Sequence, residues 1–274
     1  MKIGVFDSGL GGLAILRKFY EVLPDYDYIY LADNAHVPYG NKSADLIYKY
    51  TKSAVEFLFN KNCALIVLAC NAATTNALRR LQREYLPKLY PKRRIIGVVK
   101  PVVEEAIRKS SKKIGVIGTY ATVATQSFVK ELKKLNRKVV VYQQACPLLV
   151  PVIEEGELSW SGLDLLLDKY LSPIKNRGVE SLILACTHYE LIADKIQKHI
   201  GTSIKVIPEG KITAKKLADY LRRHPEIEST LNKGHIRTYY VTDQNQIFAK
   251  MTRMFLGEFW RDSDELKLCS LESA

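Results

Sequence analysis

The feature of this sequence that most restricts its fold is a regular alternation of short apolar runs and longer amphipathic stretches. The runs are nearly continuous in apolar residues, which is typical of strands buried on both faces of a parallel sheet, and the stretches between them have helical spacing. The alternation predicts an α/β fold with parallel sheets covered by helices on both faces. The predicted strands are residues 2–6, 26–31, 64–69, 94–99, 113–117, 139–142, 181–184 and 204–207. The predicted helices include residues 13–22, 43–59, 74–85, 102–109, 128–135 and 191–200.

Two strand sequences recur in the same order along the chain. The segment KIGV at residues 2–5 recurs at residues 113–116, and LIVLAC at residues 65–70 is echoed by LILAC at residues 182–186. Two matches at similar separations predict that an α/β half has been duplicated. We therefore expect one domain of residues 1–97 plus 208–274, with the C-terminal segment returning to the first half, and a second domain of residues 98–207.

Both copies of the second repeated strand end in a cysteine. Cys70 is followed by Asn71 and Cys186 by Thr187, which are good helix-capping residues, so a helix should begin beyond each thiol. A helix N-terminus favours thiolate, and we expect it to lower both thiol pKa values below ~8.5. His188, two residues after Cys186, adds a proton partner.

Two thiols at equivalent strand ends favour a particular kind of chemistry. Inverting a carbon that bears a hydrogen requires removal of the proton from one face and its return to the other. Two similar halves that face each other across a cleft supply one acid/base for each face. We expect the pair to share one proton, as thiolate on one side and thiol on the other.

The first predicted strand leads into the glycine-rich loop Asp7-Ser8-Gly9-Leu10-Gly11-Gly12. We do not expect it to bind a dinucleotide, because Ala14 stands where G-x-G-x-x-G requires glycine and Asp7 would repel a pyrophosphate. Asp7 and Ser8 are better suited to hold a substrate ammonium group or to relay protons near Cys70. The glycines would let the backbone approach an anion. Tyr39, in the loop after the second strand, is placed to close over a ligand.

The chain carries 41 Lys and Arg residues against 29 Asp and Glu, a formal net charge of +12. This excess is compatible with nucleic acid, an acidic membrane surface or a small anionic substrate. Most basic residues alternate with apolar ones at helical spacing, so we interpret them as solvated helix faces. No recognition motif accompanies the charge, and we do not expect nucleic acid as a partner.

No apolar run approaches the ~18–20 residues of a membrane span, and no signal-peptide core precedes the first strand. The five cysteines form no CxxC pair and no dense framework. We therefore expect reduced thiols, no membrane association and a cytoplasmic location. Cys186 and His188 have no matching pair at zinc-ligand spacing, so we expect no metal.

Taken together, the motifs resemble those of the bacterial glutamate racemases, within the aspartate/glutamate racemase superfamily. Weaker blocks from Cys146 to Gly156 and around Val241-Thr242-Asp243 extend the resemblance over nearly the whole chain. The blocks that carry it most specifically are Asp7-Ser8-Gly9, Pro38-Tyr39-Gly40, Cys70-Asn71 and Cys186-Thr187-His188-Tyr189.

The resemblance implies two similar parallel-sheet α/β domains related by pseudo-twofold symmetry, with the active site in the cleft between them. It implies interconversion of L- and D-glutamate without a cofactor, which supplies D-glutamate for peptidoglycan. It also implies that the protein is a homodimer.

The same resemblance implies roles for the matched residues. Cys70 and Cys186 are the two acid/bases, the first acting on D-glutamate and the second on L-glutamate. Asp7 and His188 tune these thiols, and Glu154 matches a further catalytic acidic residue near the second one. The matched substrate-binding residues are Asp7, Ser8, Tyr39, Gly40, Asn71, Thr187 and His188, with Thr119 and Thr122 as further candidates.

Three positions depart from the family pattern. Ala72 stands where a threonine is usual, which removes a hydroxyl that Thr74 or Thr75 is available to replace. Glu190 takes the place of a proline, and Pro208-Glu209 takes the place of Asp-Ser. Because the acid/base set is complete, the departures concern affinity and substrate choice rather than the reaction.

Two other functions remain open from the sequence. One is racemisation of aspartate or another acidic amino acid, which is suggested by Ala72. The other is a non-catalytic binding protein that acts through its basic surface. That alternative predicts salt-sensitive binding of nucleic acid that survives the loss of both cysteines.

Overall fold

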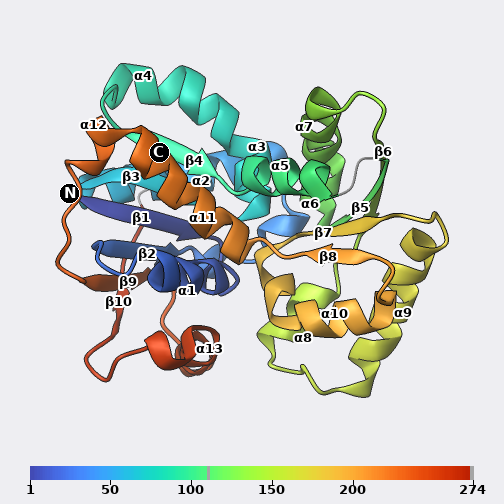
Figure 1. Ribbon diagram of the computed structural model, residues 1–274. Helices are drawn as coiled ribbons and strands as arrows, with labels where there is room; N and C mark the ends of the chain where they lie inside the picture. The colour runs from blue at the N-terminus through green and yellow to red at the C-terminus, as the bar shows by residue number, and fades with distance from the viewer. Residues whose placement is uncertain (110–111, 272–274) are drawn as a thin grey trace.

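The computed structural model describes residues 1–109 and 112–271 and contains two parallel β-sheets with helices packed on both faces (Figure 1). The larger one, sheet A, has the strand order β10-β9-β2-β1-β3-β4, and all its pairings are parallel. Its strands are β1 Lys2–Asp7, β2 Tyr28–Ala32, β3 Cys63–Leu68, β4 Arg94–Gly97, β9 Arg237–Val241 and β10 Leu266–Leu268.

The smaller one, sheet B, repeats the central order of sheet A. Its strand order is β6-β5-β7-β8, again all parallel, so that β5 corresponds to β1 and β7 to β3. The strands that share the repeated sequences therefore occupy equivalent places, and the predicted pair of similar parallel-sheet α/β domains is confirmed. The strands of sheet B are β5 Lys113–Gly118, β6 Val140–Ala145, β7 Ser181–Ala185 and β8 Lys205–Ile207.

Helices connect successive strands, as parallel pairing requires. The α-helices are α1 Gly12–Val22, α2 Ala44–Asn60, α3 Asn71–Arg80, α4 Leu86–Leu89, α5 Val99–Lys109, α6 Tyr120–Ala124, α7 Ser127–Leu135, α8 Leu149–Glu154, α9 Ser161–Lys175, α10 Ala193–Ile200, α11 Gly210–Arg223, α12 Pro225–Glu228 and α13 Gln246–Leu256. Leu81–Tyr85 forms a π-helical turn, and the short 3₁₀ helices are η1 Asn34–His36, η2 Tyr39–Asn41, η4 Thr187–Ile192 and η5 Gly257–Phe259.

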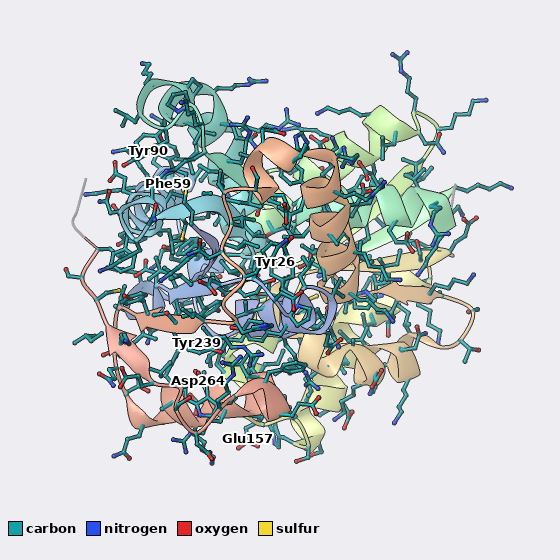
Figure 2. The ribbon with its side chains drawn as sticks, turned by 60° about the vertical axis from the view of Figure 1, so that its left-hand side comes forward. Tyr26, Phe59, Tyr90, Glu157, Tyr239 and Asp264 are labelled. Carbon is teal, nitrogen blue, oxygen red and sulfur yellow. The ribbon has the colours of Figure 1, made fainter. Side chains whose placement is uncertain are left out.

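Each sheet separates two apolar layers, because successive side chains of a strand point to opposite faces. On sheet A, Tyr30 faces a core shared with α1, α11 and α13, whereas Leu31 faces α2 and α3. On sheet B, α5 and α7 pack on one face and α9 and α10 on the other (Figure 1). Aromatic pairs add to this packing. Phe59, near the end of α2, packs on Tyr90 with ring centroids 4.5 Å apart (Figure 2).

The chain passes between the two sheets at two points. β4 ends at Gly97 in sheet A and α5 begins at Val99, and the residue between them, Val98, is fully buried. β8 ends at Ile207 in sheet B and α11 begins at Gly210. These crossings support a division into residues 1–97 plus 208–274 and residues 98–207, which we retain as a proposal.

Two strands of sheet A, β9 and β10, were not predicted from the sequence. They extend the sheet beyond β2, with β9 paired to β2 and β10 to β9. β9 begins with Arg237 and Thr238, and β10 is only three residues long and largely exposed. Neither segment forms the continuous apolar run by which the central strands are recognised.

Candidate active site

A small pocket lies between the two sheets, where the central strands of both reach their carboxyl ends. In parallel α/β sheets, the loops at these ends are where ligands usually bind. Ser8 follows β1, Cys70 follows β3, Thr119 follows β5 and Cys186 follows β7. The residues that line the pocket are Ser8, Val37, Pro38, Tyr39, Gly40, Cys70, Asn71, Ala72, Thr119, Thr122, Val150, Ala185, Cys186, Thr187 and His188.

The structure brings the predicted site residues together, from positions far apart in the sequence. The two cysteines line the pocket, and so do all the predicted substrate-binding residues except Asp7. The remaining predicted residues, Asp7 and Glu154, contact its lining through hydrogen bonds to Thr187 and His188 respectively.

Cys70 lies between β3 and α3 and caps the N-terminus of α3. Its Sγ atom accepts a hydrogen bond from the N–H of Ala73 at 3.5 Å, and its thiol donates to Oγ of Ser8 at 3.6 Å. The residue is only 6% exposed. The helix begins directly after this thiol, as the capping pattern predicts.

Cys186 has the equivalent place after β7, but its surroundings differ. The chain continues into the 3₁₀ helix η4 rather than an α-helix, and the Cys186 side chain forms no capping hydrogen bond. Its Sγ atom lies 3.8 Å from Nδ1 of His188, whose Nε2 lies 2.9 Å from Oε1 of Glu154. The carboxylate thus orients the imidazole toward the thiol, as a hydrogen bond to one ring nitrogen commonly does.

The expected lowering of the two thiol pKa values is wrong. Burial raises the pKa of Cys70 to about 12, and the nearby Asp7 raises it further, although hydrogen bonds from Ala73 and Ser8 act in the opposite direction. Burial likewise raises the pKa of Cys186 well above its ordinary value, while the backbone N–H of His188 lowers it. The loss of hydration therefore outweighs the helix ends, and both thiols are protonated at neutral pH in this closed pocket.

Asp7 lies beneath the pocket and joins its two halves. Its Oδ1 atom accepts a hydrogen bond from the N–H of Gly9 at 2.9 Å, and its Oδ2 atom accepts one from Oγ1 of Thr187 at 3.2 Å. The carboxyl is fully buried, which raises its pKa, while His188 and these hydrogen bonds lower it. The Asp7 carboxyl thus connects Gly9, in the loop after β1, to Thr187, the residue that follows Cys186.

Tyr39 is held in the pocket wall by Asp33, a residue to which the sequence analysis assigned no role. The Tyr39 hydroxyl donates to Oδ2 of Asp33 at 2.6 Å, and Asp33 also accepts from Oγ1 of Thr242 at 2.9 Å. Asp33 is fully buried and Tyr39 is 1% exposed. Tyr39 is therefore anchored through Asp33 to Thr242, the residue that follows β9. The sequence did not indicate that β9 lies beside β2.

Gly11 and Gly40 allow the two halves to approach closely at the pocket. A Cβ atom at Gly11 would lie 2.8 Å from the backbone nitrogen of His188, and one at Gly40 would lie 2.5 Å from Cβ of Thr119. Both distances are shorter than side chains tolerate. The glycine-rich loop was expected to make room for an anion, whereas in the structure Gly11 makes room for the opposite half of the protein.

Ala72 lines the pocket, and neither nearby threonine replaces its missing hydroxyl. The hydroxyl of Thr74 donates to the carbonyl of Leu68 at 2.8 Å, and that of Thr75 donates to the carbonyl of Asn71 at 2.9 Å. Both threonines line a different groove. The expected compensation is therefore wrong, because the Thr74 hydroxyl satisfies a carbonyl at the end of β3 and the Thr75 hydroxyl satisfies one in α3. Thr119 and Thr122, in contrast, do line the pocket.

The two other departures from the family pattern meet beside the pocket. Oε2 of Glu190 accepts hydrogen bonds from the N–H groups of Glu209 and Gly210, at 2.9 and 3.3 Å. Oε2 of Glu209 accepts a hydrogen bond from Nδ2 of Asn71 at 2.7 Å. Both glutamates are departures from the family pattern, but nothing in the sequence indicates that they share one hydrogen-bond network.

The basic residues of the chain are concentrated elsewhere. A second groove, of about 940 Å³, runs between α3, α5, α7 and α11, and none of the predicted site residues lines it. Some of its charges are paired, as where Nζ of Lys216 lies 2.6 Å from Oε2 of Glu104 and where Arg79 pairs with Glu131. The basic residues of this groove come mainly from helices, as their helical spacing predicts.

Over the described ranges 1–109 and 112–271, no cluster of three or more His, Cys, Asp or Glu side chains is arranged to hold a metal ion. Within the same ranges, no helix has the length and apolar character needed to span a membrane. All five cysteines are free thiols.

Comparisons with known proteins agree on one family. The sequence model of the family described as Asp/Glu/Hydantoin racemase matches residues 3–217. The glutamate racemase of Aquifex aeolicus is 39% identical over 259 residues, which are 94% of this chain and 95% of that protein. The glutamate racemase of a Sulfurihydrogenibium species is 38% identical over 274 residues, covering 99% of this chain and all of the relative. The structure of the glutamate racemase of Francisella tularensis in complex with D-glutamate superposes with a TM-score of 0.89 at 32% identity, covering 100% of this chain and 98% of that chain.

Proposed function

The chain belongs to the Asp/Glu/Hydantoin racemase family and is a racemase, and from that premise we propose that it interconverts L- and D-glutamate through the thiols of Cys70 and Cys186. One observation carries the proposal. The two thiols end equivalent strands of two similar sheets and line the same pocket, one from each half of the protein.

In the proposed reaction, the thiolate on one side removes the proton from the α-carbon of glutamate, and the electron pair of that bond stays on carbon. The thiol on the opposite side then donates its proton to the other face. The first sulfur ends as a thiol and the second as a thiolate, so proton exchange with solvent has to restore the starting form before the next turnover in the same direction. The protons transferred are held by this chain's own residues, and the proposal requires no cofactor.

A thiolate has to form when the substrate binds, with loss of one proton to solvent, because burial keeps both thiols protonated in the closed pocket. Asp7 raises the pKa of both cysteines, and each added negative charge disfavours the next. The ammonium group of an amino acid brings a positive charge into the same space, which offsets a thiolate. Asp7 and Ser8 are proposed to bind that ammonium group.

The carbanion that forms at the α-carbon needs electrostatic stabilisation. The helices α3 and η4 begin directly after the two cysteines, so their first N–H groups, which have no partner within the helix, lie beside the pocket. A preorganised donor of this kind typically lowers a barrier by about 2.7–4 kcal/mol. We propose that these backbone N–H groups, including those of Asn71 and Thr187, bind the carboxylate oxygens on which the charge develops.

The supporting residues divide between the two thiols. His188 and Glu154 are proposed to assist Cys186, which acts on L-glutamate, and Ser8 to assist Cys70, which acts on D-glutamate. Tyr39 and Gly40 are proposed to enclose the substrate. The proposed product, D-glutamate, is used for peptidoglycan. A homodimer also remains a prediction, which light scattering of the purified protein would test.

The test is incubation of the pure protein with L-glutamate in D₂O, with optical rotation and α-deuteration followed together. We expect rotation to fall to zero while deuterium enters the α-position. A folded sample that retains both the rotation and the α-proton would contradict the proposal.

Aspartate is the second candidate substrate, because Ala72 in the pocket wall lacks a hydroxyl that neither neighbouring threonine replaces. The same experiment with L-aspartate decides between the two. Faster deuteration of aspartate than of glutamate would make it the preferred substrate.

A further inference from the structure

Glu209 is a buried carboxyl for which the proposed reaction has no direct use. It lies at the second crossing between the sheets, between the end of β8 and the start of α11, and is 1% exposed. Burial raises its pKa well above the ordinary value, and the neighbouring Glu190 and Asp7 raise it further. A carboxyl in such a place costs folding free energy unless its oxygens are fully hydrogen-bonded.

The hydrogen bonds of Glu209 connect the segments that follow the two cysteines. Its backbone N–H donates to Glu190, which lies in η4 after Cys186. Its side chain accepts from Nδ2 of Asn71, which directly follows Cys70, at 2.7 Å. Glu209 therefore lies in a chain of contacts that runs from one thiol-bearing segment to the other.

Glu209 also leaves polar atoms unsatisfied. Oε1 of Glu209 and Oδ1 of Asn71 are both buried without a hydrogen-bond partner. Native proteins leave few such atoms, and those that remain call for an explanation. Here two of them belong to one hydrogen-bonded pair of side chains.

The contact with Glu209 determines which end of the Asn71 amide is free. In the structure Nδ2 of Asn71 donates to Oε2 of Glu209, so this oxygen acts as the acceptor and does not carry the carboxyl proton. Asn71 therefore turns its NH₂ group to Glu209 and keeps Oδ1 unpaired. Asn71 lines the pocket and Glu209 does not, so the atom left for a ligand is an acceptor.

We propose that Glu209 is a positioning residue that fixes the Asn71 amide with its oxygen available to the substrate, where it accepts a hydrogen bond from the ammonium group. The proposal rests on the proposed function, because it assumes an amino-acid substrate in this pocket. It assigns a role to one of the positions at which this chain departs from the family pattern. Glu190 supports the arrangement by holding the backbone of residues 209 and 210.

The test compares steady-state constants of Glu209→Met and Glu209→Gln with those of the wild type, using α-deuteration in D₂O. Methionine keeps the length of the side chain but removes the acceptor, so we expect KM to rise about tenfold with a smaller change in kcat. Glutamine keeps an acceptor oxygen, so it should restore a KM close to that of the wild type. Stability to urea should not fall in Glu209→Met, because an unsatisfied buried carboxyl is lost.

A double-mutant cycle with Asn71→Ala establishes whether Glu209 acts through Asn71. We expect Glu209→Met to have no further effect on KM once the Asn71 amide is absent. Thr213→Val is the matched control, because Thr213 lies one turn along α11, is buried, and has a hydroxyl without a partner. Its KM should equal that of the wild type. If Glu209→Met does not fold, Glu209→Ala takes its place in the cycle.

Two outcomes would overturn the proposal: an unchanged KM in folded Glu209→Met or Glu209→Ala, or the same rise in KM with and without the Asn71 amide. These differ from failure of the proposed function, which the wild type alone reveals. If the wild type exchanges the α-proton of aspartate and not of glutamate, the cycle is run on aspartate. If the wild type racemises glutamate but KM is unchanged in the folded Glu209 variants, only the role of Glu209 is refuted.

Discussion

The two thiol-bearing strand ends are equivalent in topology and different in chemistry. Cys70 caps an α-helix and is hydrogen-bonded to a backbone N–H and to the Ser8 hydroxyl. Cys186 precedes a 3₁₀ helix and lies beside the imidazole of His188, which Glu154 orients. The neighbours of the Cys70 sulfur are thus neutral hydrogen-bonding groups, whereas the neighbours of the Cys186 sulfur are an imidazole and a carboxyl group.

The difference shows what duplication of an α/β half preserves and what it leaves free. Strand order and register fix where each sulfur lies, because the strands of both halves end at the same pocket. The side chains around each sulfur are set by the local sequence, which has diverged. The two thiols can therefore have equivalent positions in the fold and still differ in their chemical roles.

The largest expected effect comes from removing either sulfur. Cys70→Ser and Cys186→Ser should each lower racemisation about a thousandfold or more, because a hydroxyl is a far weaker acid than a thiol at the same place. The proposed roles also predict one-sided exchange in D₂O. Cys70→Ser should still exchange the α-proton of L-glutamate, and Cys186→Ser that of D-glutamate.

The measurement is α-deuteration by NMR together with optical rotation, and circular dichroism verifies that each variant is folded. Equal residual exchange of both enantiomers in either variant would contradict the assignment of one sulfur to each face. Cys63→Ser, in a buried thiol at the start of β3 and outside the pocket, is the control and should racemise like the wild type.

An intermediate effect should distinguish the two sets of supporting residues. His188→Asn should lower kcat/KM about a hundredfold and Ser8→Ala less, since general acid/base assistance exceeds a single neutral hydrogen bond. The equilibrium constant between mirror-image amino acids is unity, so kcat/KM has to fall equally in both directions. The asymmetry has to be sought in deuterium isotope effects.

With substrate deuterated at the α-carbon, His188→Asn should increase the isotope effect for L-glutamate and decrease it for D-glutamate, because proton transfer at Cys186 becomes slower. Ser8→Ala should do the opposite. Both variants changing the isotope effects in the same direction would mean that His188 and Ser8 do not serve different thiols.

The smallest expected effect is on stability. It compares a thiol of the pocket with one outside it, by the pH dependence that each buried thiol gives to the free energy of unfolding. Burial raises the pKa of Cys63 and of Cys70 to about 12. A raised pKa in the folded state gives stability that is complete below the pKa of the unfolded chain, ~8.5, and is lost as pH rises toward 12. Each thiol should lower the free energy of unfolding by about 1.4 kcal/mol per pH unit in that window.

Urea unfolding of Cys63→Ala and Cys70→Ala at pH 8.5 and 10.5 measures this contribution. Both variants should lose stability less steeply than the wild type, and to the same degree. A Cys70→Ala variant with the slope of the wild type would indicate that this thiol ionises as easily in the folded protein as in the unfolded chain.

The parts of the fold that follow from local pattern could be predicted from the sequence. The central strands are continuous apolar runs, and the repeated KIGV and LILAC segments indicate which strands correspond. The capping residues after Cys70 locate the start of α3. β9 and β10 were not predicted, because their polar and short sequences become strands only through pairing at the edge of sheet A.

The chemistry of the site was predictable in its residue types and not in its energetics. The helix-end argument gives the correct position of Cys70 but the wrong direction for its pKa, because burial depends on both halves of the protein. The anchoring of Tyr39 by Asp33 and of Asn71 by Glu209 joins residues distant in the sequence. Such pairings are tertiary, and no local pattern encodes them.

The close fit of Gly11 against His188 and of Gly40 against Thr119 has a consequence for throughput. With Cys70 and Cys186 only 6% and 7% exposed, an amino acid needs the two halves to move apart before it can contact both side chains. Every turnover must therefore include one opening and one closing of the two halves. The rates of substrate entry and product release then set an upper limit on the turnover rate, and faster proton transfer by the acid/base groups cannot raise that limit.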